Sequence, residues 1–147
     1  MRVVVQRVKH ASCTIDGNLY SSIDQGYLLL VGFTHTDSIK EVQYLAKKIA
    51  GLRIFEDENG KMNLSLKTIG GKILSISQFT LYAETKDGNR PAFINAMKPD
   101  EASKLYDLFN EELRKYDIEV FTGIFGSDMK IDLLNDGPVT IIYDENF

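Results

Sequence analysis

The chain of 147 residues contains one cysteine, two histidines and no tryptophan. The single thiol, Cys13, excludes an intrachain disulfide and a metal site built from clustered cysteines. Cys13 lies in an alternating run, where an inert buried thiol is expected. His10 and His35 are far apart in the sequence, and no zinc-binding, nucleophile-elbow or phosphate-loop motif accompanies them. The sequence therefore predicts a protein that works with neither a metal ion nor another cofactor.

Long apolar runs and an excess of positive charge are also missing. The longest apolar run, residues 27–31, is far too short to span a bilayer, and the start of the chain has no signal-peptide pattern. We therefore expect a cytoplasmic protein with no membrane partner. The formal net charge of −4 argues against general binding of nucleic acid, which needs a cationic surface. Any contact with RNA has to be local.

The patterning of apolar residues predicts one domain over residues 1–147 with an α+β architecture. Alternating or continuous apolar segments predict strands, and Asp16-Gly17 is a hairpin-turn signal. Two helices are expected to pack on this mostly antiparallel set of strands. The expected strands begin at Val3 and then cover residues 27–33, 52–55, 72–77, 118–121, 129–134 and 139–143.

Both predicted helices have recognisable starts. Ser38 and Glu41 have the spacing of a capping box, and apolar residues then recur at helical spacing over residues 39–49. Gly51 is well placed to end this helix. Pro99 suits the first turn of the second helix, because a missing N–H costs little there.

Two segments carry polar residues that helix or strand patterning does not require. Residues 77–83, Ser-Gln-Phe-Thr-Leu-Tyr-Ala, place polar side chains at the end of a buried strand. This is typical either of a strand with one polar face or of a strand end that faces a pocket. Residues 135–140, Asn-Asp-Gly-Pro-Val-Thr, have the composition of a turn between two strands. The residues alone favour the polar strand face and the ordinary turn.

Together with three further stretches, these two segments resemble one known family. The stretches are residues 5–8 (Val-Gln-Arg-Val), residues 53–63 (from Arg-Ile-Phe to Gly-Lys-Met-Asn) and residues 125–129 (Phe-Gly-Ser-Asp-Met). In this order, and over essentially the whole chain, they are similar to bacterial D-aminoacyl-tRNA deacylases. The motifs at 77–81 and 135–140 are together highly specific to that family. Ser127 stands where alanine is expected, which is a small-for-small difference.

The resemblance implies a β-barrel-like α+β domain that works as a symmetric homodimer and hydrolyses the ester between a D-amino acid and tRNA. Glycyl-tRNA is also an implied substrate, and L-aminoacyl-tRNA is spared. The peptide between Gly137 and Pro138 is expected to be cis and to enter the partner's active site. There its carbonyls would bind the α-amino group of the substrate and leave no room for an L side chain. Arg7 would hold this segment in its working orientation, and Asn135 and Met129 would support the site.

The implied catalytic residues are Ser77, Gln78, Phe79 and Thr80. Ser77 and Gln78 would position the terminal adenosine or the ester, and N–H groups near Phe79 and Thr80 would stabilise the oxyanion. Thr80 has no partner base visible in the sequence, so water, assisted by the 2′-hydroxyl of the terminal ribose, is the expected nucleophile. The implied partners are the 3′ end of aminoacyl-tRNA and a second copy of the chain.

Two other functions stay open on the sequence. A module that binds the end of an RNA without hydrolysis would keep the pocket but turn over no substrate. A serine hydrolase would need His10 or His35 close to Ser77 or Thr80, which their order in the sequence does not exclude.

Overall fold

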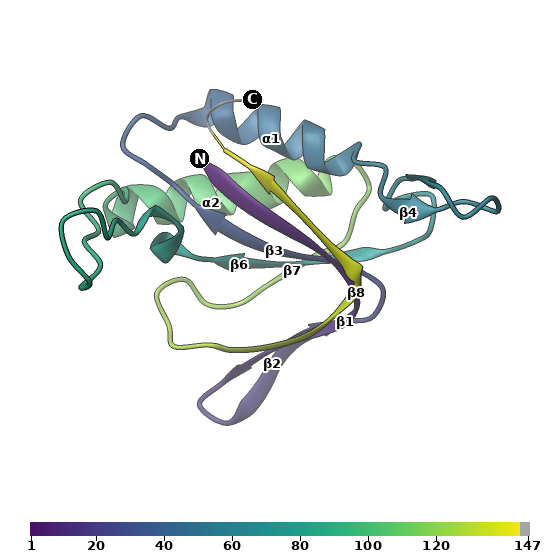
Figure 1. Cartoon of the computed structure of the whole chain (residues 1–147), viewed down its shortest axis with the longest axis horizontal. Helices are drawn as coiled ribbons and strands as arrows, with labels where there is room; N and C mark the ends of the chain where they lie inside the picture. The colour runs from purple at the N-terminus through teal and green to yellow at the C-terminus, as the bar shows by residue number, and fades with distance from the viewer. Residues whose placement is uncertain (145–147) are drawn as a thin grey trace.

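The long strand β1 (Arg2–Ile15) organises the sheet, because it pairs along both of its edges. On one edge its first half is antiparallel to β3 (Gly26–Gly32), and its second half is antiparallel to β2 (Asn18–Ile23). On the other edge it is antiparallel to β8 (Lys130–Tyr143) over nearly its whole length. The computed structural model describes residues 1–144 (Figure 1).

The rest of the sheet is parallel. Strand β6 (Lys72–Ser77) pairs with β3, and β7 (Val120–Thr122) pairs with β6. The sheet curls back on itself, since the hydroxyl of Ser21 in β2 donates to the carbonyl of Thr122 at the far edge over 2.8 Å. The expected barrel-like α+β fold is therefore confirmed, and its parallel half is a detail that the sequence pattern did not specify.

Two hairpins connect neighbouring strands. Asp16 and Gly17 join β1 to β2 with φ values of 51° and 77°. Left-handed backbone at both central residues is the geometry that suits a two-residue hairpin, so this predicted turn is confirmed. A second, small hairpin of β4 (Phe55–Glu56) and β5 (Met62–Leu64) projects from one end of the molecule (Figure 1).

Helices α1 (Ile39–Ala50) and α2 (Pro99–Arg114) lie together over one face of the sheet (Figure 1). The predicted capping box of α1 is present: the Ser38 hydroxyl accepts from a backbone N–H of the first turn, and the Glu41 carboxylate accepts from the Ser38 N–H. The hydrogen bonds from Ser38 hold the pKa of Glu41 below its ordinary value. Helix α2 begins at the predicted proline. Within residues 1–144, no helix is long and apolar enough to cross a membrane.

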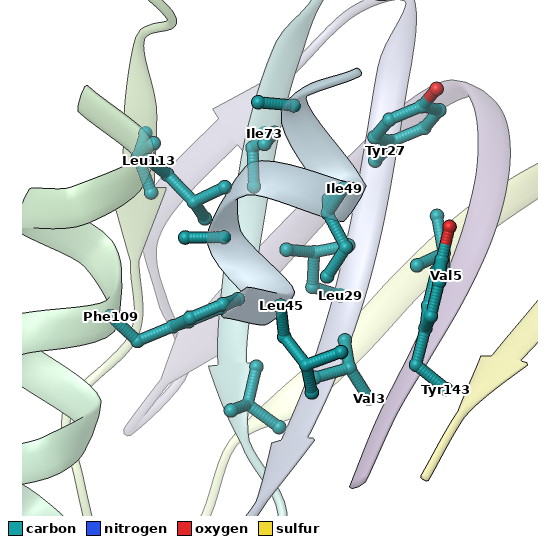
Figure 2. Packing of buried hydrophobic residues seen from close by; sticks show 14 of the residues in the cluster. Val3, Val5, Tyr27, Leu29, Leu45, Ile49, Ile73, Phe109, Leu113 and Tyr143 are labelled. Carbon is teal, nitrogen blue, oxygen red and sulfur yellow. The ribbon is translucent and has the colours of Figure 1, made fainter. Parts of the chain in front are cut away.

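The sheet buries side chains on both faces. Between the sheet and the helices lies the larger core, in which Ile49 and Phe109 from the two helices meet Leu29 of β3 (Figure 2). The opposite face encloses a second apolar cluster inside the curled sheet. Cys13 belongs to this cluster and has no exposed surface, and burial raises the pKa of its thiol. The predicted burial of this thiol is thus confirmed. The members of the second cluster are Val8, Ala11, Cys13, Ile23, Leu28, Leu74 and Ile76.

One strand prediction and one predicted turn are wrong. Residues 52–54 form no strand, because their main-chain carbonyls face side chains: Tyr27 Oη donates to the Leu52 carbonyl over 3.2 Å, and Arg7 Nη1 donates to the Ile54 carbonyl over 2.7 Å. Residues 129–134 and 139–143 are not two strands joined by a turn. They belong to the single strand β8, because β1 is long enough to pair with both halves.

We expect Gly26→Ala to destabilise the fold by about 3 kcal/mol or more, because a side chain there forces the backbone to shift. A Cβ at Gly26 would lie 1.8 Å from the carbonyl oxygen of Lys72, where β3 and β6 begin to pair. Urea denaturation followed by circular dichroism measures the free energy of unfolding. Gly88→Ala is the control, since a Cβ there meets nothing within 4 Å, and it should change stability by less than about 0.5 kcal/mol. Equal stability of the two variants would contradict this account of the strand pair.

Candidate active site

A cavity of about 610 Å³ opens at the carboxyl ends of β3 and β6. The start of α2 closes one side of it, and the segment that leads into β8 closes another. Its walls are mainly apolar, and Lys98 and Asp128 are the charged residues among them. Such a cavity is the usual size for one small ligand. The apolar lining consists of Val31, Phe33, Ile76, Phe79, Phe93, Ala96, Met97, Pro99, Ala102, Phe125, Met129 and Ile131.

The polar segment that follows β6 turns directly into this cavity. Ser77, Gln78 and Phe79 line it, whereas Thr80 is exposed and does not. The Gln78 N–H donates to the Val31 carbonyl over 2.7 Å, which ties the segment to the end of β3. A short 3₁₀ helix, η1 (Phe79–Tyr82), begins here.

The first hydrogen bond of η1 runs from the Leu81 N–H to the Gln78 carbonyl. The N–H groups of Phe79 and Thr80 precede it and are therefore not used inside the helix. The segment is a pocket wall with N–H groups that η1 does not use, and not a strand with one polar face.

The hydroxyl of Thr80 has an amide as its neighbour. The side-chain nitrogen of Gln78 donates to Thr80 Oγ1, and an amide is not a base that could remove the hydroxyl proton. Neither histidine lines the cavity: His10 is an exposed residue of β1, and His35 Nε2 is bonded to the Ile94 carbonyl at 2.6 Å. The arrangement that a serine hydrolase needs is thus not formed by residues 1–144.

Other residues of the cavity lining come from segments further along the chain. Met129 contributes to the wall, together with Phe125 and Ser127 from the same stretch. Phe93 and Lys98 also line the cavity, and sequence reasoning missed both. Neither lies in a periodic pattern, so only their place in the fold identifies them. Within residues 1–144, no three histidine, cysteine or acidic side chains group closely enough to share a metal ion.

The second motif lies in a bulge of β8. Gln6 of β1 pairs with Thr140 and Val8 pairs with Asn135, so residues 136–139 of β8 stand opposite Arg7 alone. The peptide between Gly137 and Pro138 is cis, as expected, and both residues are exposed. Gly137 has a φ of 146°, a conformation that side chains rarely allow. The predicted turn is therefore a bulge that presents main chain to the surface.

Arg7 and Asn135 hold this bulge from beneath. Arg7 is 5% exposed, and its Nε donates to the Asp136 carbonyl over 2.8 Å. The Asn135 side chain accepts from the Val139 N–H over 2.7 Å and donates to the Val139 carbonyl over 3.2 Å. Each of these bonds joins a side chain to a main-chain N–H or carbonyl group of the bulge. Together they fix the shape of its backbone.

The two motifs are not brought together within one chain. Arg7 pairs with Tyr27 of β3, whereas Ser77 pairs with Val31, so the motifs are separated by roughly 13 Å along the strands. Gly137 and Pro138 do not line the cavity. One chain therefore presents the cavity and the exposed bulge at different ends of β3.

Comparison with known proteins agrees with this arrangement of motifs. A family model described as D-Tyr-tRNA(Tyr) deacylase matches residues 4–144, so the chain belongs to this family. Curated relatives named D-aminoacyl-tRNA deacylase include a protein of Exiguobacterium sibiricum, 58% identical over 99% of this chain and 100% of its own. Another, from Fusobacterium nucleatum, is 59% identical over 98% of this chain and 95% of its own. The activity of the chain is accordingly hydrolysis of D-aminoacyl-tRNA.

Solved structures share the fold. A protein described as c-Myc DNA Unwinding Element Binding Protein superposes with a TM-score of 0.91 at 40% identity and covers 98% of both chains. A probable eukaryotic D-amino acid tRNA deacylase superposes with a TM-score of 0.82 at 18% identity over 97% of both chains. The similarity to this second structure, at 18% identity, shows a shared fold only.

We expect Thr80→Ala to keep the rate of D-tyrosyl-tRNA hydrolysis within about tenfold of wild type, because nothing in the structure activates this hydroxyl. Removal of a true nucleophile costs roughly four to six orders of magnitude. Single-turnover release of D-tyrosine from charged tRNA measures the chemical step. A rate near the uncatalysed background, in a variant with an unchanged circular dichroism spectrum, would identify Thr80 as the nucleophile.

Proposed function

We propose that the cavity binds the terminal adenosine of tRNA with its D-amino acid, and that a second copy of the chain completes the site with its Gly137–Pro138 segment. One observation carries this proposal: the bulge is exposed and rigidly held, yet it lies away from the cavity of its own chain. In a two-fold dimer each subunit gives its bulge to the other, so both sites are completed together.

Discrimination between the two hands of the amino acid rests on main chain in this proposal. The carbonyls of the Gly137–Pro138 segment bind the α-amino group, and their position excludes an L side chain. Exclusion needs no attractive contact with the D side chain, which suits a substrate whose side chains vary. Glycine has no side chain to exclude, so glycyl-tRNA is hydrolysed too. The shape of this segment requires glycine at position 137, since its φ is 146° and a Cβ there would lie 2.6 Å from Val139 Cγ2.

The segment at the end of β6 supplies the groups that promote hydrolysis. Ser77 and Gln78 position the adenosine or the ester, and the N–H groups of Phe79 and Thr80, which η1 does not use, stabilise the developing oxyanion. Water attacks the ester carbonyl with assistance from the 2′-hydroxyl of the terminal ribose. An ester is activated enough for this, so a protein nucleophile is unnecessary. Met129 forms part of the wall against which the substrate packs, while Arg7 and Asn135 shape the bulge.

The partners in this proposal are the 3′ end of aminoacyl-tRNA and the second copy of the chain, and the cytoplasm, where charged tRNA is used, is the place of action. An RNA-end-binding module without hydrolysis is the alternative. The family match favours the enzyme, because relatives 58% and 59% identical over nearly the whole chain are named D-aminoacyl-tRNA deacylase.

We expect the protein to release D-tyrosine and glycine from charged tRNA, and to act on L-tyrosyl-tRNA at least about 100-fold more slowly, since a steric clash of about 3 kcal/mol suffices for that ratio. Initial rates on the three charged tRNAs under identical conditions measure this. Equal rates on the two tyrosyl-tRNAs would disprove selection by exclusion. No release from any of them, with the tRNA still bound, would favour the binding module.

The shared site is tested by mixing two impaired variants, Gln78→Ala and Gly137→Ala. If Gln78 of one subunit works with Gly137 of the other, each mixed dimer has one intact site of its two, so the purified mixed dimer should show about half of wild-type activity. Subunits carrying different affinity tags are refolded together, and the mixed dimer is purified and assayed. If each site lay within one chain, every chain of the mixed dimer would carry one defect, and its activity would stay at the level of the parents.

A further inference from the structure

An aromatic pair lies at the mouth of the cavity. Phe79 of η1 and Phe93 of the loop formed by residues 83–97 both line the cavity, and their ring centroids are 4.9 Å apart with the planes at 61°. Phe79 is 57% exposed and Phe93 is 37% exposed. Their edge-to-face arrangement leaves ring surface open to a further planar group. The neighbouring Ile94, 73% exposed, extends the apolar surface.

The loop that carries Phe93 is tied down close to the ring. The N–H groups of Glu84 and Ala92 each donate to the other residue's carbonyl over 2.9 Å, which closes the loop just before Phe93. The Thr34 hydroxyl donates to the Asn95 carbonyl over 2.6 Å just after it. Phe93 is therefore presented at a fixed place, and its exposure is not that of a loose loop tip.

The size of the cavity determines which part of the tRNA end lies beside the two phenylalanine rings. Cavities of roughly 300–1,000 Å³ hold one small ligand, so about 610 Å³ suits one aminoacyl-nucleoside. The preceding nucleotides of the tRNA end have to lie outside, past the mouth. They are unpaired in every tRNA, and their bases are therefore free to stack on protein side chains.

The charge of the chain makes stacking more important here than contact with phosphates. The net charge is −4, and in the loop itself Lys86 and Arg90 are balanced by Glu84 and Asp87. Counterion release from phosphates therefore contributes little to affinity. Stacking of a base on an aromatic ring is independent of sequence and needs no positive charge.

We propose that Phe93, supported edge-on by Phe79, is the platform on which the nucleotide before the terminal adenosine stacks. Phe93 is then a positioning residue that fixes where the RNA chain leaves the site, and it touches no reacting atom. The inference rests on the proposed placement of the terminal adenosine in the cavity. A stacking contact of this kind lets a protein of net charge −4 bind the RNA end without relying on phosphate contacts.

The test compares Phe93→Ala with wild type on two substrates, D-tyrosyl-tRNA and the minimal ester D-tyrosyl-adenosine, which lacks the stacked nucleotide. We expect kcat/KM on the tRNA to fall about tenfold more than kcat/KM on the minimal ester, with the loss mainly in KM. Phe93→Trp should restore the wild-type ratio, and Phe93→Leu should not, because a leucine is apolar but offers no ring. Phe121→Ala is the matched control: Phe121 is also 37% exposed but does not line the cavity, and this variant should leave both substrates unaffected.

A binding measurement separates this inference from the proposed function. Affinity for the uncharged trinucleotide CCA, compared with adenosine, should depend on Phe93 whether or not the protein hydrolyses esters. Equal losses on tRNA and on the minimal ester would place Phe93 inside the adenosine site and overturn the inference. A Phe93→Ala variant that no longer dimerises in analytical ultracentrifugation would overturn it as well, because the ring would then belong to an interface between subunits.

Discussion

The guanidinium of Arg7 donates to two main-chain carbonyls that are far apart in the sequence, one in the bulge of β8 and one at the base of the β4–β5 hairpin. A buried cation is unfavourable unless it is hydrogen-bonded, and Arg7 donates from Nε and Nη1 to main-chain carbonyls. The Asp136 carboxylate, 3.9 Å from Arg7 Nε, adds a nearby opposite charge. Since four residues of β8 face Arg7 alone, its hydrogen bond to the Asp136 carbonyl and those of Asn135 to Val139 hold the bulge in place.

The mixed direction of the strands explains why the cavity and the bulge lie at different ends of β3. β3 and β6 are parallel, so their carboxyl ends meet at one edge of the sheet, where the cavity forms. β1 and β8 are antiparallel to each other, and their bulge lies toward the start of β3. An all-antiparallel sheet would have no such shared carboxyl end beside β3. The parallel half of the sheet therefore creates the pocket, and the antiparallel half supplies the exposed main chain.

Sequence reasoning succeeded where local chemistry decides the structure. Ser38 with Glu41 marks the start of a helix, and Asp16-Gly17 marks a hairpin, because the signals act within a few residues. Reasoning failed at residues 135–140, where the same residue types suit a turn or a bulge, and only the length of β1 decides between them. Ser77, Gln78, Phe79 and Met129 were found through family resemblance, and they do meet at one cavity. Phe93 comes from an irregular loop without a motif, so its place at the mouth could only be read from the fold.

The buried thiol of Cys13 has a practical consequence. It is the only thiol of the chain, has no exposed surface and lies inside the second apolar cluster. Alkylating reagents can reach it only after this cluster opens, so its rate of modification reports how often the curled sheet comes apart. The protein thus contains its own reporter of native-state opening. For the same reason, oxidants that cross-link surface cysteines have no target while the fold is intact.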